Sequence, residues 1–444
     1  MLGGVRLLAR KAEKQFETWL AESPRKALLV KGARQVGKSY LVDSFARHSF
    51  ENVVSFDLIE DSSTRASFLQ ATSAEDLMLR ISVAATATLV PGKSAIVIDE
   101  VQEAPNVLTY LKYLVQQGDY RFILTGSLLG VTLENIDSLP VGYVTQVEMH
   151  PLDFEEFCWA CRLNQSVYQG AVRCFMQEKP LPDFLYRRLT DLFHRYLMVG
   201  GMPDAVNSFV ATNNIDSVRT VHQDLHALYR GDITKHAPAE LRLVIRDIYD
   251  LIPSEAASKG RRFRLSSIDN VRRFNQVQNH FLWLTQAGVA LAVYNVTAPV
   301  HPLLVSEQRN RFKLFYLDAG MLASSYPKSA YEGLLDGRAS MNMGGVYEAF
   351  VAQELAAHGL ALRYFTSKKV GELDFLVEHA DGTVDALEVK SGASYLTHAA
   401  LDNALSIKNY TIDRALVLGE TNVKRAGNIL YAPVFLVGAL ETDA

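Results

Sequence analysis

Short apolar runs alternate with longer helical stretches over residues 27–150. The runs are ALLVKG (27–32), NVVSFDL (52–58), AIVIDE (95–100), RFILTGS (121–127) and VTQVEMHPL (144–152). A continuously apolar strand is buried on both faces, and such strands alternating with helices are typical of a parallel sheet covered by helices. We therefore predict an α/β fold with a parallel sheet in this part of the chain, preceded by an amphipathic helix over residues 8–22.

The pattern changes after residue 150. Residues 151–240 are helical and aromatic, and VGGMPDAV (199–206) interrupts them. Residues 241–306 predict a small helical module that ends in a strand pair within GVALAVYNVTAPVHPLL. From residue 344 onward the pattern predicts helix, strand, hairpin, helix and strand in that order. These changes give four predicted domains, with the boundaries 1–150, 151–240, 241–310 and 311–444.

The segment GARQVGKS fits the pattern G-x-x-x-x-G-K-[ST] of a phosphate-binding loop, or P-loop. It follows an apolar run and precedes a helical one, which is the strand–loop–helix context that the motif needs. Glycines let backbone N–H groups close around phosphates, and the helix N-terminus adds positive partial charge. Lys38 would contact the β- and γ-phosphates, and Ser39 would offer its hydroxyl to Mg²⁺. We therefore expect ATP to be bound by Gly32, Ala33, Arg34, Gln35, Val36, Gly37, Lys38, Ser39 and Tyr40.

Two acids end the apolar run AIVIDE. The carboxyl end of a buried parallel strand faces the ligand crevice, so we expect Asp99 to hold Mg²⁺. Glu100 would then act as the general base on the attacking water. The run RFILTGS ends in hydroxyls, and its Ser127, or else Thr125, would orient that water or contact the γ-phosphate. We therefore predict Lys38, Glu100 and Ser127 as the catalytic residues of an ATPase.

ATP hydrolysis of this kind often needs an arginine that stabilises the transition state, supplied by the same chain or by a neighbour. The sequence does not choose among the arginines that could serve, which are Arg187, Arg188, Arg195 and Arg230. An arginine supplied by a neighbouring copy would imply a homo-oligomer.

Segments spread along nearly the whole chain carry a family resemblance. They are KGARQVGKSYLV, AIVIDEVQEAP, LTGSLLG, VEMHPLDFEEF, YLMVGGMPDAV, KLFYLDAGML, GGVYEAFVAQEL, GELDFLVE and LEVKSG. They resemble the prokaryotic AAA+-like P-loop ATPases that carry a C-terminal domain of unknown function. The resemblance implies an AAA+-type core, a helical lid, a winged-helix-like module and a C-terminal domain similar to restriction endonucleases. The chain departs from the family in ending its P-loop with Ser39 instead of the commoner threonine, and in an insertion at residues 158–182.

The segment GELDFLVEHADGTVDALEVKSG predicts a β-hairpin. If its loop is the three residues Ala-Asp-Gly, with glycine in the left-handed conformation, Asp374 lies opposite Glu388 and Glu372 lies opposite Lys390. Side chains two residues apart share a face of a strand, so these four side chains would gather on one side of the hairpin. A two-residue Asp-Gly turn would shift the register by one and scatter them.

Asp374, Glu388 and Lys390 match the signature of metal-dependent nucleases, in which an Asp is followed by Glu-x-Lys. In that interpretation the two acids hold a second Mg²⁺ at the scissile phosphate, and Lys390 activates water or stabilises charge. Glu348, in the helical segment GGVYEAFVAQEL, would complete the set. Two other interpretations stay open: the domain binds a partner without cleaving it, or these residues form an ordinary surface ion-pair network.

The net charge of −4 and the pI of about 6.3 do not by themselves indicate nucleic-acid binding. One basic segment, SKGRRFRLSSIDNVRR, falls in the predicted winged-helix-like module. Contacts with DNA would come from its basic side chains, Lys259, Arg261, Arg262, Arg264, Arg272 and Arg273. Modules of this type also bind proteins, so the sequence leaves DNA, RNA or a protein open as the partner.

The chain has three cysteines, Cys158, Cys161 and Cys174. Three are too few for a disulfide framework and one short of a structural zinc site, so we expect reduced thiols in a helical region. The first residues lack the apolar stretch and cleavage site of a signal peptide, and no run reaches the ~18 apolar residues of a membrane span. We therefore expect a cytoplasmic protein without a membrane segment.

These features predict Mg²⁺-dependent ATP binding and hydrolysis that drives a conformational cycle. We expect the cycle to be coupled to a nuclease-like C-terminal domain that acts on nucleic acid. The alternative is an ATP-dependent switch whose C-terminal domain is catalytically inactive and binds a protein or nucleic-acid partner. A slow nucleotide sensor is a third interpretation.

Overall fold

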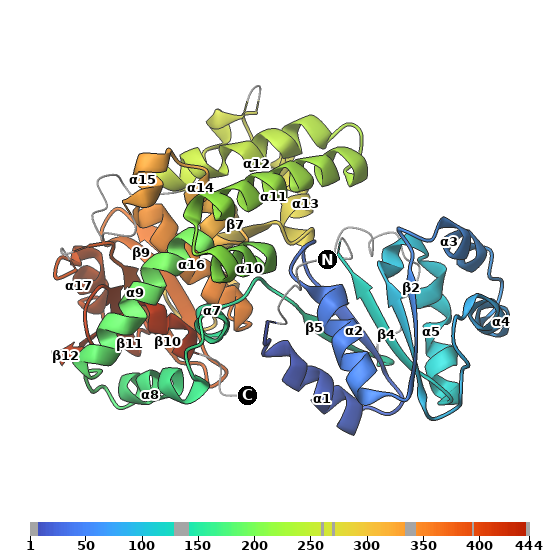
Figure 1. Ribbon diagram of the computed structural model, residues 1–444. Helices are drawn as coiled ribbons and strands as arrows, with labels where there is room; N and C mark the ends of the chain where they lie inside the picture. Colours follow the sequence, from blue (N-terminus) through green and yellow to red (C-terminus); the bar gives the residue numbers. More distant parts are fainter. Residues whose placement is uncertain are drawn as a thin grey trace. The chain divides into compact units, whose positions relative to one another are not determined.

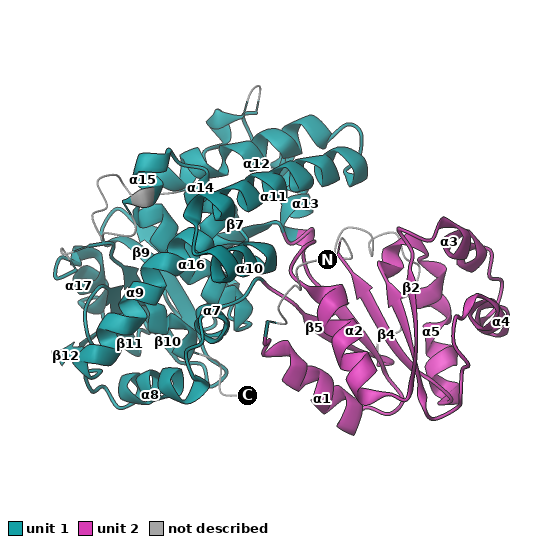
Figure 2. Cartoon of the chain, viewed as in Figure 1, with its two compact units in different colours: residues 1–8, 151–285, 289–444 teal, residues 9–150, 286–288 magenta. Residues whose placement is uncertain are grey.

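The computed structural model describes residues 8–127, 142–258, 262–268, 271–333, 343–392 and 395–440. The chain divides into two compact units, which Figure 2 shows in different colours. The smaller unit consists of residues 9–150 and 286–288, and the larger unit of residues 1–8, 151–285 and 289–444.

The smaller unit contains a five-stranded parallel sheet in the order β2-β3-β4-β1-β5 (Figure 1). Its strands are β1 (Ala27–Lys31), β2 (Asn52–Asp57), β3 (Ser94–Asp99), β4 (Arg121–Gly126) and β5 (Val144–Glu148). Its helices are α1 (Ala12–Glu22), α2 (Lys38–Ser49), α3 (Ser62–Leu69), α4 (Ala74–Ala84) and α5 (Asn106–Gln117). The predicted parallel α/β sheet is confirmed, and each predicted apolar run coincides with one of its strands to within a few residues.

Both faces of this sheet are covered. On one face, alternate strand residues such as Leu29, Ile96 and Leu124 join a core with α3, α4 and α5. The residues between them, such as Leu28 and Ile123, are also fully buried. Burial on both faces explains why the central strands β1, β3 and β4 are almost continuously apolar, whereas the edge strands β2 and β5 are only partly buried and carry polar residues.

The larger unit begins with a helical region. Its helices are α7 (Phe154–Ala160), α8 (Gln165–Met176), α9 (Asp183–Val199), α10 (Pro203–Thr212), α11 (Ile215–His236) and α12 (Arg242–Ala257), and α13 (Gln278–Gln286) follows them along the chain. The predicted interruption at residues 199–206 is confirmed. Helix α9 ends at Val199, the chain turns at Gly200 with a φ of +66°, and α10 starts at Pro203, where the fixed φ of proline suits the first helical position.

An eight-stranded mixed sheet follows, in the order β12-β13-β11-β10-β9-β8-β6-β7. Its strands are β6 (Ala290–Val296), β7 (Glu307–Tyr316), β8 (Arg363–Ser367), β9 (Gly371–Glu378), β10 (Val384–Val389), β11 (Arg414–Gly419), β12 (Lys424–Ala426) and β13 (Ile429–Pro433). Its accompanying helices are α14 (Ala319–Ser324), α15 (Lys328–Glu332), α16 (Gly344–Ala357) and α17 (Ala399–Leu405).

The strand pair expected within residues 288–304 is wrong in its second member. β6 pairs antiparallel with β7, which starts only at Glu307. The segment between them carries Pro299 and Pro302, and proline cannot donate a hydrogen bond to a strand ladder. Because β6 and β7 belong to the same sheet as the C-terminal strands, the predicted boundary at residue 310 falls inside one continuous sheet.

The predicted hairpin register is confirmed. β9 and β10 pair antiparallel, and the partners include Val384 with Glu378 and Leu387 with Phe375. Gly382 has a φ of +86°, the left-handed conformation that the three-residue loop requires. The first ladder residues after this loop are therefore in the register that places Asp374 opposite Glu388.

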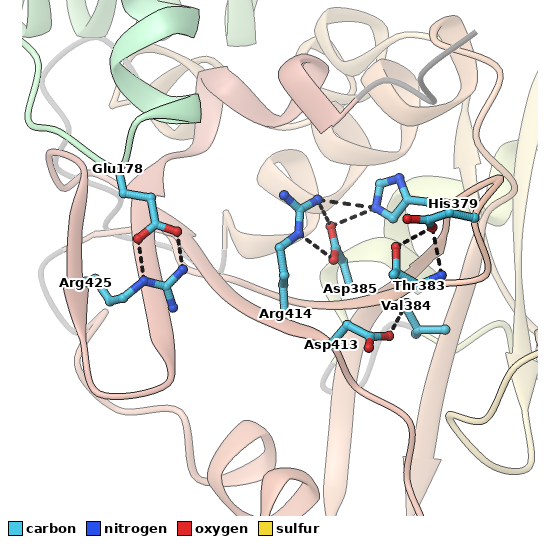
Figure 3. Close-up of polar contacts among 9 residues, drawn as sticks. Glu178, His379, Thr383, Val384, Asp385, Asp413, Arg414 and Arg425 are labelled. Atoms are coloured by element: carbon cyan, nitrogen blue, oxygen red, sulfur yellow. Dashed lines mark hydrogen bonds and ion pairs between the residues drawn. The ribbon is translucent and has the colours of Figure 1, made fainter.

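An ion pair between the exposed Arg414 and the buried Asp385 holds the loop end of this hairpin to β11 (Figure 3). Asp385 is fully buried, and Arg414 Nε donates to its Oδ1 at 2.8 Å. His379 Nε2 lies 2.9 Å from Asp385 Oδ2. A buried carboxylate needs such partners to offset the loss of its hydration, so these contacts fix β10 against β11.

The unexpected insertion at residues 158–182 packs on the C-terminal part of the chain. Tyr168, on α8, donates its hydroxyl to the carbonyl of Phe435 at 3.2 Å. Glu178 forms a two-point ion pair with Arg425 of β12 (Figure 3). The insertion is therefore an integral part of the larger unit. None of the helices in the described ranges combines the length and the apolar character needed to cross a membrane.

Candidate functional site

The P-loop connects β1 to α2. Gly32 has a φ of +150°, Gln35 of +65° and Gly37 of +91°, so the loop makes repeated turns that favour glycine. A Cβ on Gly32 would lie 2.2 Å from the carbonyl oxygen of Met149, which leaves no room for another residue. Gly37 is the N-cap of α2 and has no side-chain oxygen, so the first N–H groups of the helix are left for a bound anion.

Arg10 supports this loop from the segment before α1. Its Nη1 donates to the carbonyl oxygen of Val36 at 2.9 Å, and its Nη2 donates to that of His150 at 2.6 Å. The arginine therefore ties the P-loop to the chain that leaves β5. Sequence reasoning missed it, because nothing local to residue 10 indicates a contact 140 residues away.

Lys38 lies inside the loop. Its side chain is 4% exposed, and its Nζ donates to the carbonyl oxygens of Gly32 at 3.1 Å and Ala33 at 2.8 Å. Burial lowers the pKa of Lys38 to about 8, although the charges of Glu100 and Asp99 oppose that shift. The ammonium is therefore still charged near neutral pH and lies close to both acids.

We expect ATP binding to be accompanied by proton uptake above about pH 8. Bound phosphates favour the charged ammonium and raise the pKa of Lys38, so above its free value of about 8 the protein must take up a proton when it binds. Affinity should accordingly be flat below that pH and fall above it. Titration calorimetry in two buffers of different ionisation enthalpy, at about pH 9, measures the uptake.

The matched control for this measurement is Lys38→Arg, because a guanidinium stays charged throughout this range. A variant that still binds ATP should show no uptake. Equal proton uptake by both proteins would mean that the titrating group is not Lys38.

Asp99 and Glu100 lie at the carboxyl end of β3. In the sheet order, β4 lies between β3 and β1, so the acids, the hydroxyls after β4 and the P-loop share one edge. Thr125 donates its hydroxyl to Asp99 Oδ1. Ser127 donates to Glu100 Oε2 both from its hydroxyl, at 2.6 Å, and from its backbone N–H, at 3.2 Å. The two hydroxyl residues that the sequence left open thus donate to different carboxylates.

Glu100 is held in an unusual position. Its φ of +55° is rare for a residue other than glycine, and Gln102 donates its side-chain amide to the same Oε2 that Ser127 contacts. Burial favours a higher pKa for Glu100, but the Lys38 charge and the hydrogen bonds from Gln102 and Ser127 outweigh it and lower the pKa. The carboxylate is therefore ionised at neutral pH. Gln102 is a further residue that sequence reasoning missed.

The four arginines considered as transition-state residues all lie in the larger unit. Arg188 and Arg195 form ion pairs with Asp191 on α9, and Arg230 pairs with Asp250 at 2.7 Å. These contacts do not select one of the four, so the role of Arg187, Arg188, Arg195 or Arg230 stays a prediction.

The C-terminal acidic cluster surrounds a residue that the sequence did not single out. Lys313, on β7, is fully buried, and its Nζ lies 3.0 Å from Glu348 Oε2 and 2.7 Å from Glu372 Oε1. It also lies 3.6 Å from Asp374 Oδ1. Three of the predicted acids therefore converge on one ammonium group.

The other predicted members lie on β10 and just after it. Lys390 Nζ donates to Glu388 Oε1 at 2.7 Å, and Val389 N–H donates to Asp374 Oδ2 at 2.8 Å. Burial raises the pKa of Glu388 to about 7, and the charge of Asp374 adds to that shift while Lys390 opposes it. Glu388 Oε2 is buried without a hydrogen-bond partner in the part of the chain that the structure describes. The structure therefore brings all five predicted cluster residues together, and their role as metal ligands stays a prediction.

The basic segment is only partly described. Lys259 and Arg261 lie outside the described residues. Arg264 donates to the buried carboxylate of Glu255, with Nε 3.2 Å from Oε2, so its charge offsets an internal acid. DNA binding by the described basic residues Arg262, Arg272 and Arg273 stays a prediction.

The three cysteines lie in the helical region of the larger unit, at α7 and α8. Cys158 is buried, Cys161 and Cys174 are partly exposed, and none of these three described residues forms a disulfide. Burial raises the pKa of Cys158 well above its usual value, which makes its thiol unreactive.

Comparison with known families divides the chain into three matched parts. Residues 24–158 match a family described as an AAA domain, residues 190–330 match a domain of unknown function (DUF8612), and residues 343–435 match another (DUF4143). The first match supports AAA-type ATP binding and hydrolysis by a P-loop domain. The other two give no function. The insertion at residues 158–182 begins where the AAA match ends and finishes before the next match begins.

Two similar solved structures are described as an ATPase and as a motor. The Walker-type ATPase of Pyrococcus abyssi is 16% identical, with 73% of this chain and 99% of that chain covered and a TM-score of 0.44. The RuvB Holliday junction branch migration motor of Thermotoga maritima is 13% identical, with 74% and 95% covered and a TM-score of 0.30. A search of curated proteins found no match.

Proposed function

We propose that this chain is a Mg²⁺-dependent ATPase that uses a cycle of ATP binding and hydrolysis to change conformation. The observation that supports this most strongly is the gathering of Lys38, Asp99, Glu100 and Ser127 at one edge of a parallel sheet, next to a P-loop. Ligands bind at this edge in open α/β sheets, because the carboxyl ends of the strands and the helix N-termini meet there. The AAA domain match covers the same residues.

Each residue of the site has a chemical part in this proposal. The amides of Gly32–Gly37 and the Lys38 ammonium bind the β- and γ-phosphates of the substrate. Ser39 and Asp99 are the residues that would hold Mg²⁺, which when bound neutralises charge on the phosphate oxygens. Glu100 accepts the proton of the attacking water, and Gln102 and Ser127 keep its carboxylate in place.

The experiment that tests this function is ATP turnover by the purified chain, with Lys38→Ala as the control. We expect Mg²⁺-dependent phosphate release that the variant loses together with most of its affinity for ATP. The same assay is then repeated with added DNA and with added RNA. Stimulation by one polymer would name the class of partner, and purified protein that retains no nucleotide would contradict the proposal.

For the C-terminal part we propose a domain that binds a protein or nucleic-acid partner without cleaving it. What supports this is Lys313, whose ammonium already forms ion pairs with Glu348, Glu372 and Asp374. Nucleotide-driven changes in the smaller unit would then alter partner binding by the larger one.

A nuclease coupled to ATP hydrolysis is the second candidate. It is favoured by the confirmed hairpin register, which places Asp374, Glu388 and Lys390 together as in metal-dependent nucleases. Incubating the protein with Mg²⁺ or Mn²⁺ and with DNA or RNA separates the two candidates. Cleavage that Asp374→Ala abolishes would establish the nuclease.

We further propose a cytoplasmic location, which three cysteines outside any disulfide support. A homo-oligomer would allow a neighbouring copy to supply the transition-state arginine. Light scattering with and without ATP measures the oligomeric state.

A further inference from the structure

Lys313 is the only ammonium for which burial is complete within the described part of the chain. A buried lysine is strongly unfavourable unless carboxylates compensate its charge, and the reverse holds for buried carboxylates. Here Glu348 comes from α16, Glu372 and Asp374 come from β9, and the lysine comes from β7. The cluster is therefore assembled around a cation that the chain itself provides.

The ring faces around Lys313 add to this arrangement. Its Nζ lies 5.1 Å from the ring centre of Tyr364 and 6.0 Å from that of Phe375. Aromatic faces attract cations, most strongly where water is excluded. The pocket therefore suits a monovalent ammonium, whereas a divalent metal requires oxygen ligands and retained water on several sides.

We propose that Lys313 takes the place of a divalent cation in the C-terminal acidic cluster, so that the cluster binds no catalytic metal while this lysine is present. Oxygen ligands of Mg²⁺ lie about 2.0–2.1 Å from the ion in octahedral geometry, and an ammonium 2.7 Å and 3.0 Å from two of the carboxylates excludes that arrangement. Consistent with this, no group of three acidic, histidine or cysteine side chains among the described residues is placed to hold a metal ion.

This inference deepens the proposal for the C-terminal domain and does not depend on ATP hydrolysis. It explains why a hairpin with the nuclease-like pattern can serve in binding alone. It also predicts that one substitution opens the site. Without the ammonium, Glu348, Glu372 and Asp374 would be left as three carboxylates around a space once filled by a cation, which is the ligand chemistry that Mn²⁺ and Mg²⁺ prefer.

The first test compares Mn²⁺ binding by the nucleotide-free wild-type protein and by Asp374→Asn, followed by electron paramagnetic resonance of the free ion. Both proteins have the same P-loop unit, so Mn²⁺ bound there contributes equally to the two binding curves. We expect superimposable binding curves, because Lys313 already occupies the cluster. A wild-type protein that binds one more Mn²⁺ than Asp374→Asn would overturn the proposal.

The second test removes the charge with Lys313→Met, which keeps the length of the side chain. We expect this variant to unfold at a lower temperature than wild type without metal, to bind one additional Mn²⁺, and to regain thermal stability when it does. Adding Asp374→Asn to the Lys313→Met variant should abolish both the additional Mn²⁺ binding and the recovery of thermal stability. A folded Lys313→Met protein that gains no Mn²⁺ would also refute the proposal.

If Lys313→Met does not fold, the first comparison still tests the proposal, because the wild-type protein and Asp374→Asn both keep Lys313. ATP turnover is measured on the same preparations and reports on the P-loop site, whose predicted residues lie outside the C-terminal acidic cluster. Loss of the proposed ATPase function would therefore be distinguishable from a failure of the inference about Lys313.

Discussion

Replacing Glu100 with glutamine is expected to lower ATP turnover by about 10²–10⁴-fold while ATP remains bound, which is the range for removing a general base. The amide has nearly the same shape as the carboxylate and can still accept the hydrogen bonds of Ser127 and Gln102. It cannot accept the proton of the attacking water. The measurement is phosphate release in a single turnover, together with the affinity for a fluorescent ATP analogue.

Glu103→Gln is the matched control for this prediction. The chemical change is the same, three residues further along, but Glu103 forms its ion pair with Arg65, with Nη1 3.3 Å from Oε2. We expect its turnover to stay close to that of wild type. Turnover by Glu100→Gln at a wild-type rate would exclude Glu100 as the base, and equal losses in both variants would indicate a structural effect on the segment after β3.

The parts of the molecule that sequence reasoning predicted depend on local chemistry. A parallel strand buried on both faces must be apolar at nearly every position, so the central strands β1, β3 and β4 are visible as apolar runs. The hairpin register follows from Gly382, because only a left-handed residue closes a three-residue loop of this type. The P-loop is visible because glycines, Lys38 and a following helix occur at fixed spacing.

The residues that were missed act over long distances in the sequence. Arg10 contacts the carbonyl of His150, and Lys313 contacts Glu348 and Asp374. In the sequence, Lys313 resembles an ordinary polar position of a strand. One signal was present: α16 is apolar on nearly all sides, and a carboxylate such as Glu348 on a fully buried helix requires a cation. That argument predicts a partner but does not identify which one.

The error in the strand pair has a similar origin. Sequence reasoning placed the second strand next to the first, although proline residues interrupt residues 297–304. The pairing partner of β6 is β7, and β6 also pairs with β8, more than 60 residues further along. Sheet membership depends on such distant pairings, so a domain boundary drawn from local pattern at residue 310 could not detect that the sheet continues.

Replacing Gly201 with alanine is expected to destabilise the larger unit by more than about 3 kcal/mol, above the usual range for overpacking a core. A Cβ at this position would lie 1.9 Å from the carbonyl oxygen of Leu152. That carbonyl cannot move easily, because Tyr196 donates its hydroxyl to the same oxygen and Leu152 N–H donates to Gly201 O at 2.7 Å. Gly201 N–H in turn donates to Asp318 at 2.6 Å. The clash would thus break a buried hydrogen-bond network, and urea unfolding followed by circular dichroism measures the loss.

Gly231→Ala is the matched control, because the same methyl group would be added where it meets no atom within 4 Å, on the exposed face of α11. Alanine is favoured over glycine inside a helix by about 1 kcal/mol, so this variant should be slightly more stable than wild type. Both variants add the same methyl group to the chain, and only the surroundings of that group differ. Stability changes of opposite sign would therefore separate a steric clash from an effect on backbone entropy. If Gly201→Ala unfolds at the wild-type urea concentration, the close packing of the VGGMPDAV segment against Leu152 does not hold.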